Sequence, residues 1–277
     1  MSLDLAPHHK HGLSLDHPLL NASGTLGFAH ESARLVNLRA LGAFVTNPLT
    51  YRPRTAAHAP NAVALPAGVL VHTGLPKPGV SAALRRWDRD WRRFGPPVIV
   101  HLAATTPAET GRSLELLERA NGVAGIELGV RDDVSASELG QLVRAALGAQ
   151  PLLVRLPQAR AAKLAQAAAQ AGADALVVAA PPRTEAQTGA PGHEHPVTGR
   201  HYGPATFAAA LEALSAVAAL NLGLPLVGAG GVFTAEQAKA MLAAGAVAIQ
   251  LDAVLWTQPN KLGELLEAVE SSDGTPT

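Results

Sequence analysis

Short apolar runs alternate with longer amphipathic segments along the whole chain, and this alternation restricts the fold more than any other feature. The runs are continuous and rich in β-branched residues, which is typical of parallel strands buried on both faces. The predicted strands are residues 18–21, 43–46, 98–102, 126–128, 152–156, 176–179, 225–228 and 248–251. The predicted helices are residues 31–41, 81–94, 107–120, 135–147, 160–171, 205–220, 234–244 and 261–271. Eight strands alternating with eight helices predict an α/β protein, a (β/α)8 TIM barrel.

The length of 277 residues suits one barrel of about 250 residues, with no linker and no second domain. We therefore expect residues 1–277 to form a single domain. Residues 1–12 are polar and contain three histidines. They lack the apolar region of a secretory signal, and we expect a flexible N-terminal segment there.

Composition excludes several classes of protein. The chain has no cysteine, so disulfides, thiolate nucleophiles and cysteine metal sites are absent. Its 22 basic and 22 acidic residues argue against nucleic-acid binding, which depends on phosphate neutralisation. The chain has no apolar run of about 18 residues, the length of a membrane span. We therefore expect a cytoplasmic protein that binds neither nucleic acid nor membrane.

Two connections are about twice as long as the others. One runs from Thr46 to Val98 and the other from Ala179 to Leu224. Both follow the carboxyl end of a predicted strand, which is the active-site face of a barrel. Insertions at this face predict lids or pocket walls around a small-molecule site.

Six motifs in order, from about residue 19 to residue 259, resemble the dihydroorotate dehydrogenases. The first is Asn21–Phe28, which reads N-A-S-G-T-L-G-F. The others are the segments at Leu41–Arg54, Gly74–Gly79, Ala171–Asp174, Gly203–Ala205 and Val227–Val232. The resemblance implies a (β/α)8 barrel and the FMN-dependent oxidation of dihydroorotate to orotate in pyrimidine biosynthesis. In that reaction a base removes the C5 proton and a hydride passes from C6 to flavin N5.

The resemblance also implies which positions would surround the flavin and the substrate. The positions aligned with the flavin site are Ala22, Ser23, Gly24, Asn47, Arg155, Gly203, Gly230, Gly231 and Asp252. Asn47 and Arg155 stand where the family has lysines. Positions where the family has substrate-holding asparagines carry Val71, Gly129, Val134 and Ala180–Pro181. These side chains can neither donate nor accept a hydrogen bond.

The family's catalytic base aligns with Asp132. One hypothesis is that the Asp132 carboxylate replaces the usual thiol or hydroxyl as the base. The alternative is that Asp132 and Asp133 lie in an exposed loop before a helix. Arg155 is a second catalytic candidate. It could neutralise an anionic flavin, or it could form an ion pair with Asp132 or Glu127 at the barrel rim.

The phosphate cradle of the family aligns with two loops. Gly228–Gly231 could offer backbone N–H groups to a phosphate, or it could simply be a tight turn. In the second loop Asp252–Ala253 replaces the family's Gly-Thr pair. A carboxylate at this position repels a phosphate. FMN binding is therefore implied by the resemblance and opposed by Asn47 and Asp252.

Two further features have alternative interpretations. His193, His195 and His201 could bind a metal, but they fall in a predicted flexible loop, so we expect no metal site. Trp87 and Trp91 lie four residues apart on a charged helix. They could pack inward or against a partner.

The chemical substitutions favour a diverged paralogue that has lost the family reaction and serves as a non-catalytic partner or regulatory barrel. An alternative is a flavin oxidoreductase with Asp132 as its base and a different substrate. A third is a lyase or isomerase that uses Arg155 and Asp132. A protein partner or a homo-oligomer stays open, since the fold alone cannot choose.

Overall fold

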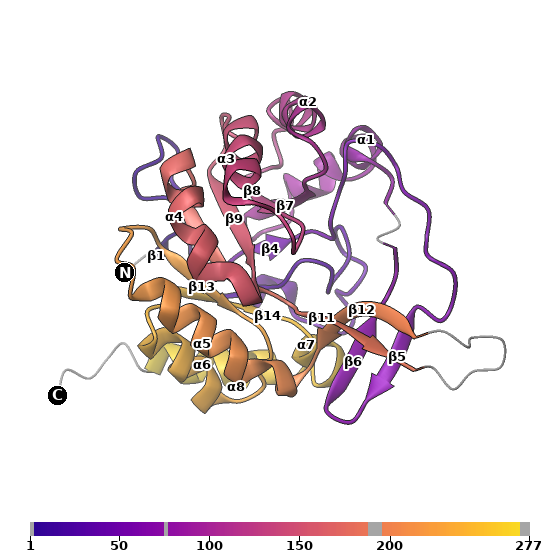
Figure 1. Ribbon diagram of the computed structural model, residues 1–277, viewed down its shortest axis with the longest axis vertical. Helices are drawn as coiled ribbons and strands as arrows, with labels where there is room; N and C mark the ends of the chain where they lie inside the picture. The colour runs from indigo at the N-terminus through magenta and orange to yellow at the C-terminus, as the bar shows by residue number, and fades with distance from the viewer. Residues whose placement is uncertain (1–2, 75–76, 188–195, 272–277) are drawn as a thin grey trace.

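The computed structural model describes residues 3–74, 77–187 and 196–271, and its centre is a parallel barrel (Figure 1). The barrel strands are β3 (Leu19–Asn21), β4 (Phe44–Val45), β7 (Val98–Ala103), β8 (Gly125–Gly129), β9 (Leu152–Pro157), β10 (Ala175–Ala180), β13 (Leu226–Ala229) and β14 (Ala248–Leu251). They pair in chain order, and a parallel bridge between Leu20 and Ala43 joins the two ends of the sheet. All eight predicted strands and the predicted fold class are confirmed.

Asn21 completes the seam between β3 and β4. Its side chain accepts a hydrogen bond from the Val45 N–H at 2.9 Å and donates one to the Val45 carbonyl at 2.7 Å. One amide side chain thereby supplies the pairing that a longer strand would make with its backbone, because an amide carries both a donor and an acceptor.

Seven of the eight predicted helices form, and one short helix, α7, was not predicted. The helices are α1 (Val80–Trp91), α2 (Pro107–Leu117), α3 (Ala136–Ala145), α4 (Ala161–Ala171), α5 (Phe207–Ala218), α6 (Ala235–Ala243), α7 (Val254–Thr257) and α8 (Lys261–Glu270). The predicted capping box of Thr234 and Gln237 is present at α6, and Gly172 ends α4 in a left-handed conformation. None of the helices within the described ranges is both long and apolar enough to cross a membrane.

The prediction of a helix at residues 31–41 is wrong. The segment consists of turns and a short 3-10 helix, η1 (Leu38–Ala40). Asn37 has an extended backbone and its side chain accepts the Arg39 N–H, which starts a new turn and interrupts the helix. Val36 and Leu38 are still buried, so turns satisfy the same apolar pattern.

The N-terminal segment closes the end of the barrel at which the parallel strands begin, which we call the lower end. A hairpin of β1 (Leu3–Asp4) and β2 (Ser14–Leu15) lies at this end, and Leu5 and Leu15 are almost completely buried in the apolar cluster of the barrel interior. Within residues 3–12, where we expected a flexible segment, Leu5 and Ala6 pack against the barrel, whereas residues 7–11 form turns that are mostly exposed.

The opposite end, at which the parallel strands finish and which we call the upper end, carries a second sheet. This sheet is built from the two long connections. Its antiparallel strands are β5 (Ala62–Leu65), β6 (Gly68–Val71), β11 (Arg183–Ala186) and β12 (Val197–Tyr202). β12 pairs with β6, so the two insertions are joined directly. Figure 1 shows this sheet projecting beyond the barrel, away from β1. The prediction of a wall at this face is confirmed.

Trp87 and Trp91 pack inward. Trp87 stacks on Phe28 with a ring-centroid distance of 4.4 Å, and Trp91 Nε1 donates to the Phe28 carbonyl at 2.7 Å. Their exposed fractions are 8% and 3%. These indoles therefore anchor α1 to the barrel, and the reading that they contact a partner is wrong.

Candidate ligand-binding site

The upper layer of the barrel interior is a connected polar network. It consists of His101, Glu127, Arg155 and Gln250 from β7, β8, β9 and β14, all at most 7% exposed. His101 Nδ1 lies 2.6 Å from Glu127 Oε1, and Arg155 Nη1 lies 3.4 Å from the same oxygen. Gln250 donates to the other Glu127 oxygen and accepts a hydrogen bond from Arg155 at 3.0 Å. Side chains from three other strands therefore converge on the Glu127 carboxylate.

The network fixes the charge of Glu127. Burial alone would raise the pKa of its carboxyl, but the hydrogen bond to His101 and the charge of Arg155 outweigh this and hold it at about 2. Burial lowers the pKa of His101, and the charges of Arg155 and Lys77 act in the same direction, against the influence of Glu127. At neutral pH a carboxylate therefore faces a neutral imidazole.

A cavity of about 680 Å³ lies between this layer and the insertion sheet. His101, Arg155 and Ser23 line its floor, and the second sheet contributes Arg183 and Arg200 to its wall. Five arginines line the cavity against two aspartates: Arg54, Arg131, Arg155, Arg183 and Arg200 against Asp132 and Asp133. The excess of guanidinium groups makes the cavity suited to an anion.

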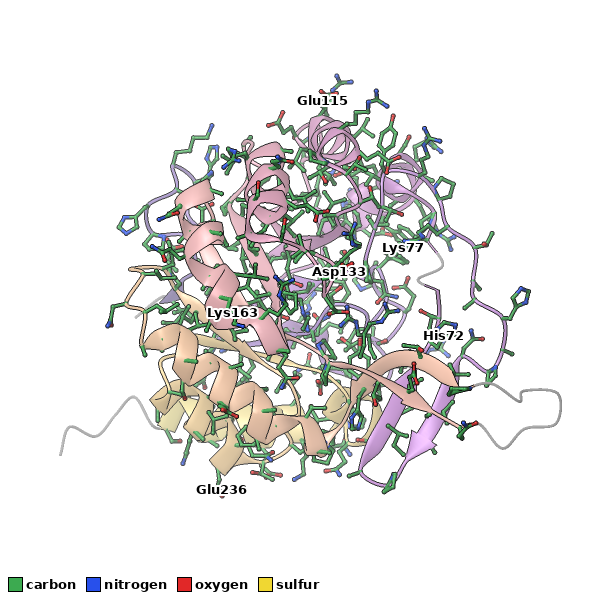
Figure 2. The ribbon with its side chains drawn as sticks, in the orientation of Figure 1. His72, Lys77, Glu115, Asp133, Lys163 and Glu236 are labelled. Atoms are coloured by element: carbon green, nitrogen blue, oxygen red, sulfur yellow. The ribbon has the colours of Figure 1, made fainter. Side chains whose placement is uncertain are left out.

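Lys77 lies on the same side of the barrel as the cavity and the insertion sheet (Figure 2). Figure 2 shows Lys77, His72 and Asp133 on the side of the barrel that carries the insertion sheet, whereas Glu115, Lys163 and Glu236 lie on the outer helices. The Lys77 ammonium has no hydrogen-bond partner among the described residues, and the side chain is only 5% exposed. Burial, reinforced by the charge of Arg54, lowers the pKa of Lys77 to about 7.

Asp132 lines the cavity but its carboxylate is already paired. Arg200 Nη1 lies 2.7 Å from Asp132 Oδ1 and also donates to the Pro181 carbonyl at 2.8 Å. The Asp132 side chain is 37% exposed. The predicted pair of Arg155 with Glu127 is present, whereas Arg155 and Asp132 form no ion pair with each other. Asp133 pairs with Arg131, and its side chain is 78% exposed.

The glycine loop contacts the carboxylate of Asp252. The Gly231 N–H donates to Asp252 Oδ2 at 3.3 Å, and the Ala253 N–H donates to Oδ1 at 2.6 Å. Asp252 is 2% exposed, and burial raises the pKa of its carboxyl. Gly231 has a φ of +67°, and a Cβ there would lie 2.6 Å from the Phe207 nitrogen. The reading of a tight turn that requires glycine is therefore confirmed.

The other flavin-aligned positions lie around the upper barrel rim. The Ser23 hydroxyl donates to the Thr46 carbonyl at 3.0 Å, and the Asn47 amide oxygen accepts the Gly27 N–H at 3.3 Å. Ala22 is buried, and Gly24 and Gly203 have positive φ angles. Of the nine positions, only Ser23 and Arg155 line the cavity.

Most of the positions aligned with the family's asparagines line the same cavity. Val71, Gly129, Ala180 and Pro181 line it, whereas Val134 is buried and does not. His193 and His195 fall outside the described residues. No group of three or more His, Cys, Asp or Glu side chains that could hold a metal occurs within residues 3–74, 77–187 and 196–271.

Sequence reasoning missed the central residues of the network. His101, Gln250 and Arg200 were not singled out, and Glu127 appeared only as a partner of Arg155. A signal was present, because His101 and Glu127 are polar residues within runs that otherwise consist of buried apolar residues. Because buried polar groups require partners, the presence of each residue could have predicted a hydrogen bond to the other.

Comparison with known proteins agrees with this architecture. A family model described as dihydroorotate dehydrogenase matches residues 8–271. The catalytic subunit of dihydroorotate dehydrogenase B (NAD(+)) from Geotalea uraniireducens (strain Rf4) is 31% identical, with 94% of this chain and 90% of that protein covered. The protein of the same name from Desulforudis audaxviator (strain MP104C) is 34% identical, with coverage of 86% and 82%. The chain therefore belongs to the dihydroorotate dehydrogenase family.

Proposed function

We propose that this chain is a diverged paralogue within its family that does not oxidise dihydroorotate and holds no FMN, and that its cavity binds another small molecule. The observation that carries the proposal is the Asp252 carboxylate, which accepts the N–H groups of Gly231 and Ala253. Those N–H groups belong to the two loops that align with the family's phosphate cradle. The Asp252 carboxylate therefore engages N–H groups that a phosphate would need.

The charge of Asp252 works against a phosphate. At a separation of about 4–6 Å and an effective dielectric of about 20, two unit negative charges repel by roughly 3–4 kcal/mol. Protonation of Asp252 would remove the repulsion but would leave a buried carboxyl in the cradle. FMN therefore does not fit the residues of this loop.

The residues at the positions aligned with the family's flavin-ring lysines support the same conclusion. Arg155 stands at a lysine position of the family and is engaged by Glu127 and Gln250. Asn47 holds the loop at Gly27, and neither position offers an ammonium. The Asp132 carboxylate is paired with Arg200, which disfavours the alternative of a flavin enzyme with Asp132 as its base.

Thermal unfolding with and without FMN tests the proposal. A ligand at 100 times its Kd stabilises the folded state by about 2.7 kcal/mol, so a genuine flavoprotein shows a clear rise in Tm. We expect no rise for this chain and no orotate when dihydroorotate and an electron acceptor are supplied. FMN-dependent orotate formation would overturn the proposal.

A protein partner is a second proposal. The relatives are named catalytic subunits, and a barrel without the family reaction could retain an assembly role. Light scattering of the purified chain, followed by affinity capture from its own cells, would test this. A monomer that retains no protein would contradict it.

A further inference from the structure

We propose that His101, oriented by Glu127, is the proton-accepting residue of a catalytic site that takes a small carboxylate carrying an acidic C–H beside a carbonyl group. This inference rests on the proposed function, because the cavity must be free of flavin. Its first support is the hydrogen bond of 2.6 Å between His101 Nδ1 and Glu127 Oε1. Since Glu127 is a carboxylate, Nδ1 carries the hydrogen and Nε2 keeps its lone pair.

His101 Nε2 is the ring nitrogen that Glu127 leaves unengaged. Among the described residues Nε2 has no hydrogen-bond partner, and it is not one of the sealed polar atoms. His101 itself lines the cavity floor. An acceptor nitrogen with an open approach is the geometry that a general base requires.

Gly129 makes room for this imidazole. A Cβ at position 129 would lie 2.3 Å from His101 Nε2, so any other residue there would displace the ring. Gly129 stands where the family carries a substrate-holding asparagine. The glycine at this position therefore lets the His101 ring take its place beside the cavity.

The cavity supplies the positive charge that the chemistry needs. Arg54 and Arg183 line it and form no ion pair within the described part of the chain. Either guanidinium can hold a carboxylate with two hydrogen bonds. The proton-transfer step is balanced without a cofactor. The substrate C–H bond breaks, an N–H bond forms at Nε2, and the electron pair moves to the carbonyl oxygen, where the cationic wall stabilises the enolate.

Bromopyruvate labelling tests the site, because the chain has no cysteine to compete. Attack by Nε2 forms an N–C bond and releases bromide, and peptide mass spectrometry locates the product. His17 is an internal control, since it pairs with Glu270 at 2.7 Å but lies on the surface. We expect His101 to react at least tenfold faster than His17, and succinate to protect His101 alone. Equal rates, or no protection, would overturn the proposal.

Deuterium exchange tests the proton transfer itself. We expect the intact protein in D2O to accelerate exchange at the methyl group of pyruvate or at C3 of 2-oxoglutarate, as measured by proton NMR. His101→Gln and Glu127→Gln should each reduce the rate at least tenfold, while His17→Gln leaves it unchanged. No acceleration with either acid would overturn the proposal, as would retained exchange in folded His101→Gln. FMN binding is a separate measurement, so failure here is distinguishable from failure of the proposed function.

Discussion

The lower and upper layers of the barrel interior are built on the same strands but consist of opposite kinds of residue. Ile99 and Leu153 of the lower layer are completely buried among apolar side chains. Two residues further along the same strands, His101 and Arg155 join the polar network. Successive inward positions of a strand are two residues apart. One such step therefore separates the apolar layer that supports the fold from the polar layer that lines the cavity.

The two layers place different demands on their side chains. The lower layer needs only apolar side chains of suitable volume. The upper layer needs each polar group to find a specific partner. Substitution in the first region should therefore alter stability alone, and substitution in the second should alter stability, charge and ligand binding together.

The largest effect should follow Glu127→Ala. This change leaves Arg155 buried without its carboxylate, and breaking a buried pair costs about 3–5 kcal/mol. Urea unfolding would measure the loss in free energy of unfolding. Glu115→Ala on the exposed face of α2 is the matched control and should change stability by less than about 0.5 kcal/mol. Equal effects of the two substitutions would contradict the network.

Leu153→Ala probes the lower layer of the same strand as Arg155. Removal of a completely buried leucine leaves a cavity and should cost about 3 kcal/mol. Bromopyruvate should nevertheless still label His101 in the folded variant. Loss of that labelling would show that the two layers are not separable.

Acid should destabilise the protein through the upper layer. The pKa of Glu127 is about 2 in the folded protein against an ordinary value of 4.5. The unfolded chain therefore binds more protons below about pH 4.5, and stability falls as the pH falls toward 2. This contribution is on the order of 3 kcal/mol. It should disappear in Glu127→Gln and persist in Leu153→Ala, as followed by urea unfolding at several pH values.

Lys77→Met should stabilise the protein. The buried ammonium has no hydrogen-bond partner among the residues that the structure describes, and an unsatisfied buried polar group costs about 1–3 kcal/mol. The pKa of Lys77 is lowered to about 7, so the penalty is complete below pH 7 and is relieved as the pH rises toward 10.5. The gain in Tm should therefore be larger at pH 6 than at pH 9. A destabilised variant at pH 6 would contradict this reading.

The sequence predicted the scaffold because its signals are local. All eight barrel strands are short, mostly apolar runs, and the capping box at Thr234 marks the start of α6. The helix expected at residues 31–41 failed because Asn37 favours a turn, and periodicity does not register that preference.

The site was harder to predict because its contacts join distant strands. Glu127 and Gln250 are 123 residues apart, and His101 meets Glu127 only through the barrel register. Asp252 was predicted to oppose a phosphate, but that it would accept the Gly231 N–H depended on the exact approach of two loops. Similarly, the pairing of β12 with β6 put Arg200 beside Asp132.

We propose that the Asp252 carboxylate excludes the flavin phosphate from this chain. The most direct test of this claim is the visible absorbance of the protein after incubation with FMN and removal of free flavin. The wild-type chain should be colourless, and the double variant Asp252→Gly, Ala253→Thr, which restores the family's pair, should gain FMN affinity. A yellow wild-type protein with bound FMN in equal amount would contradict the claim.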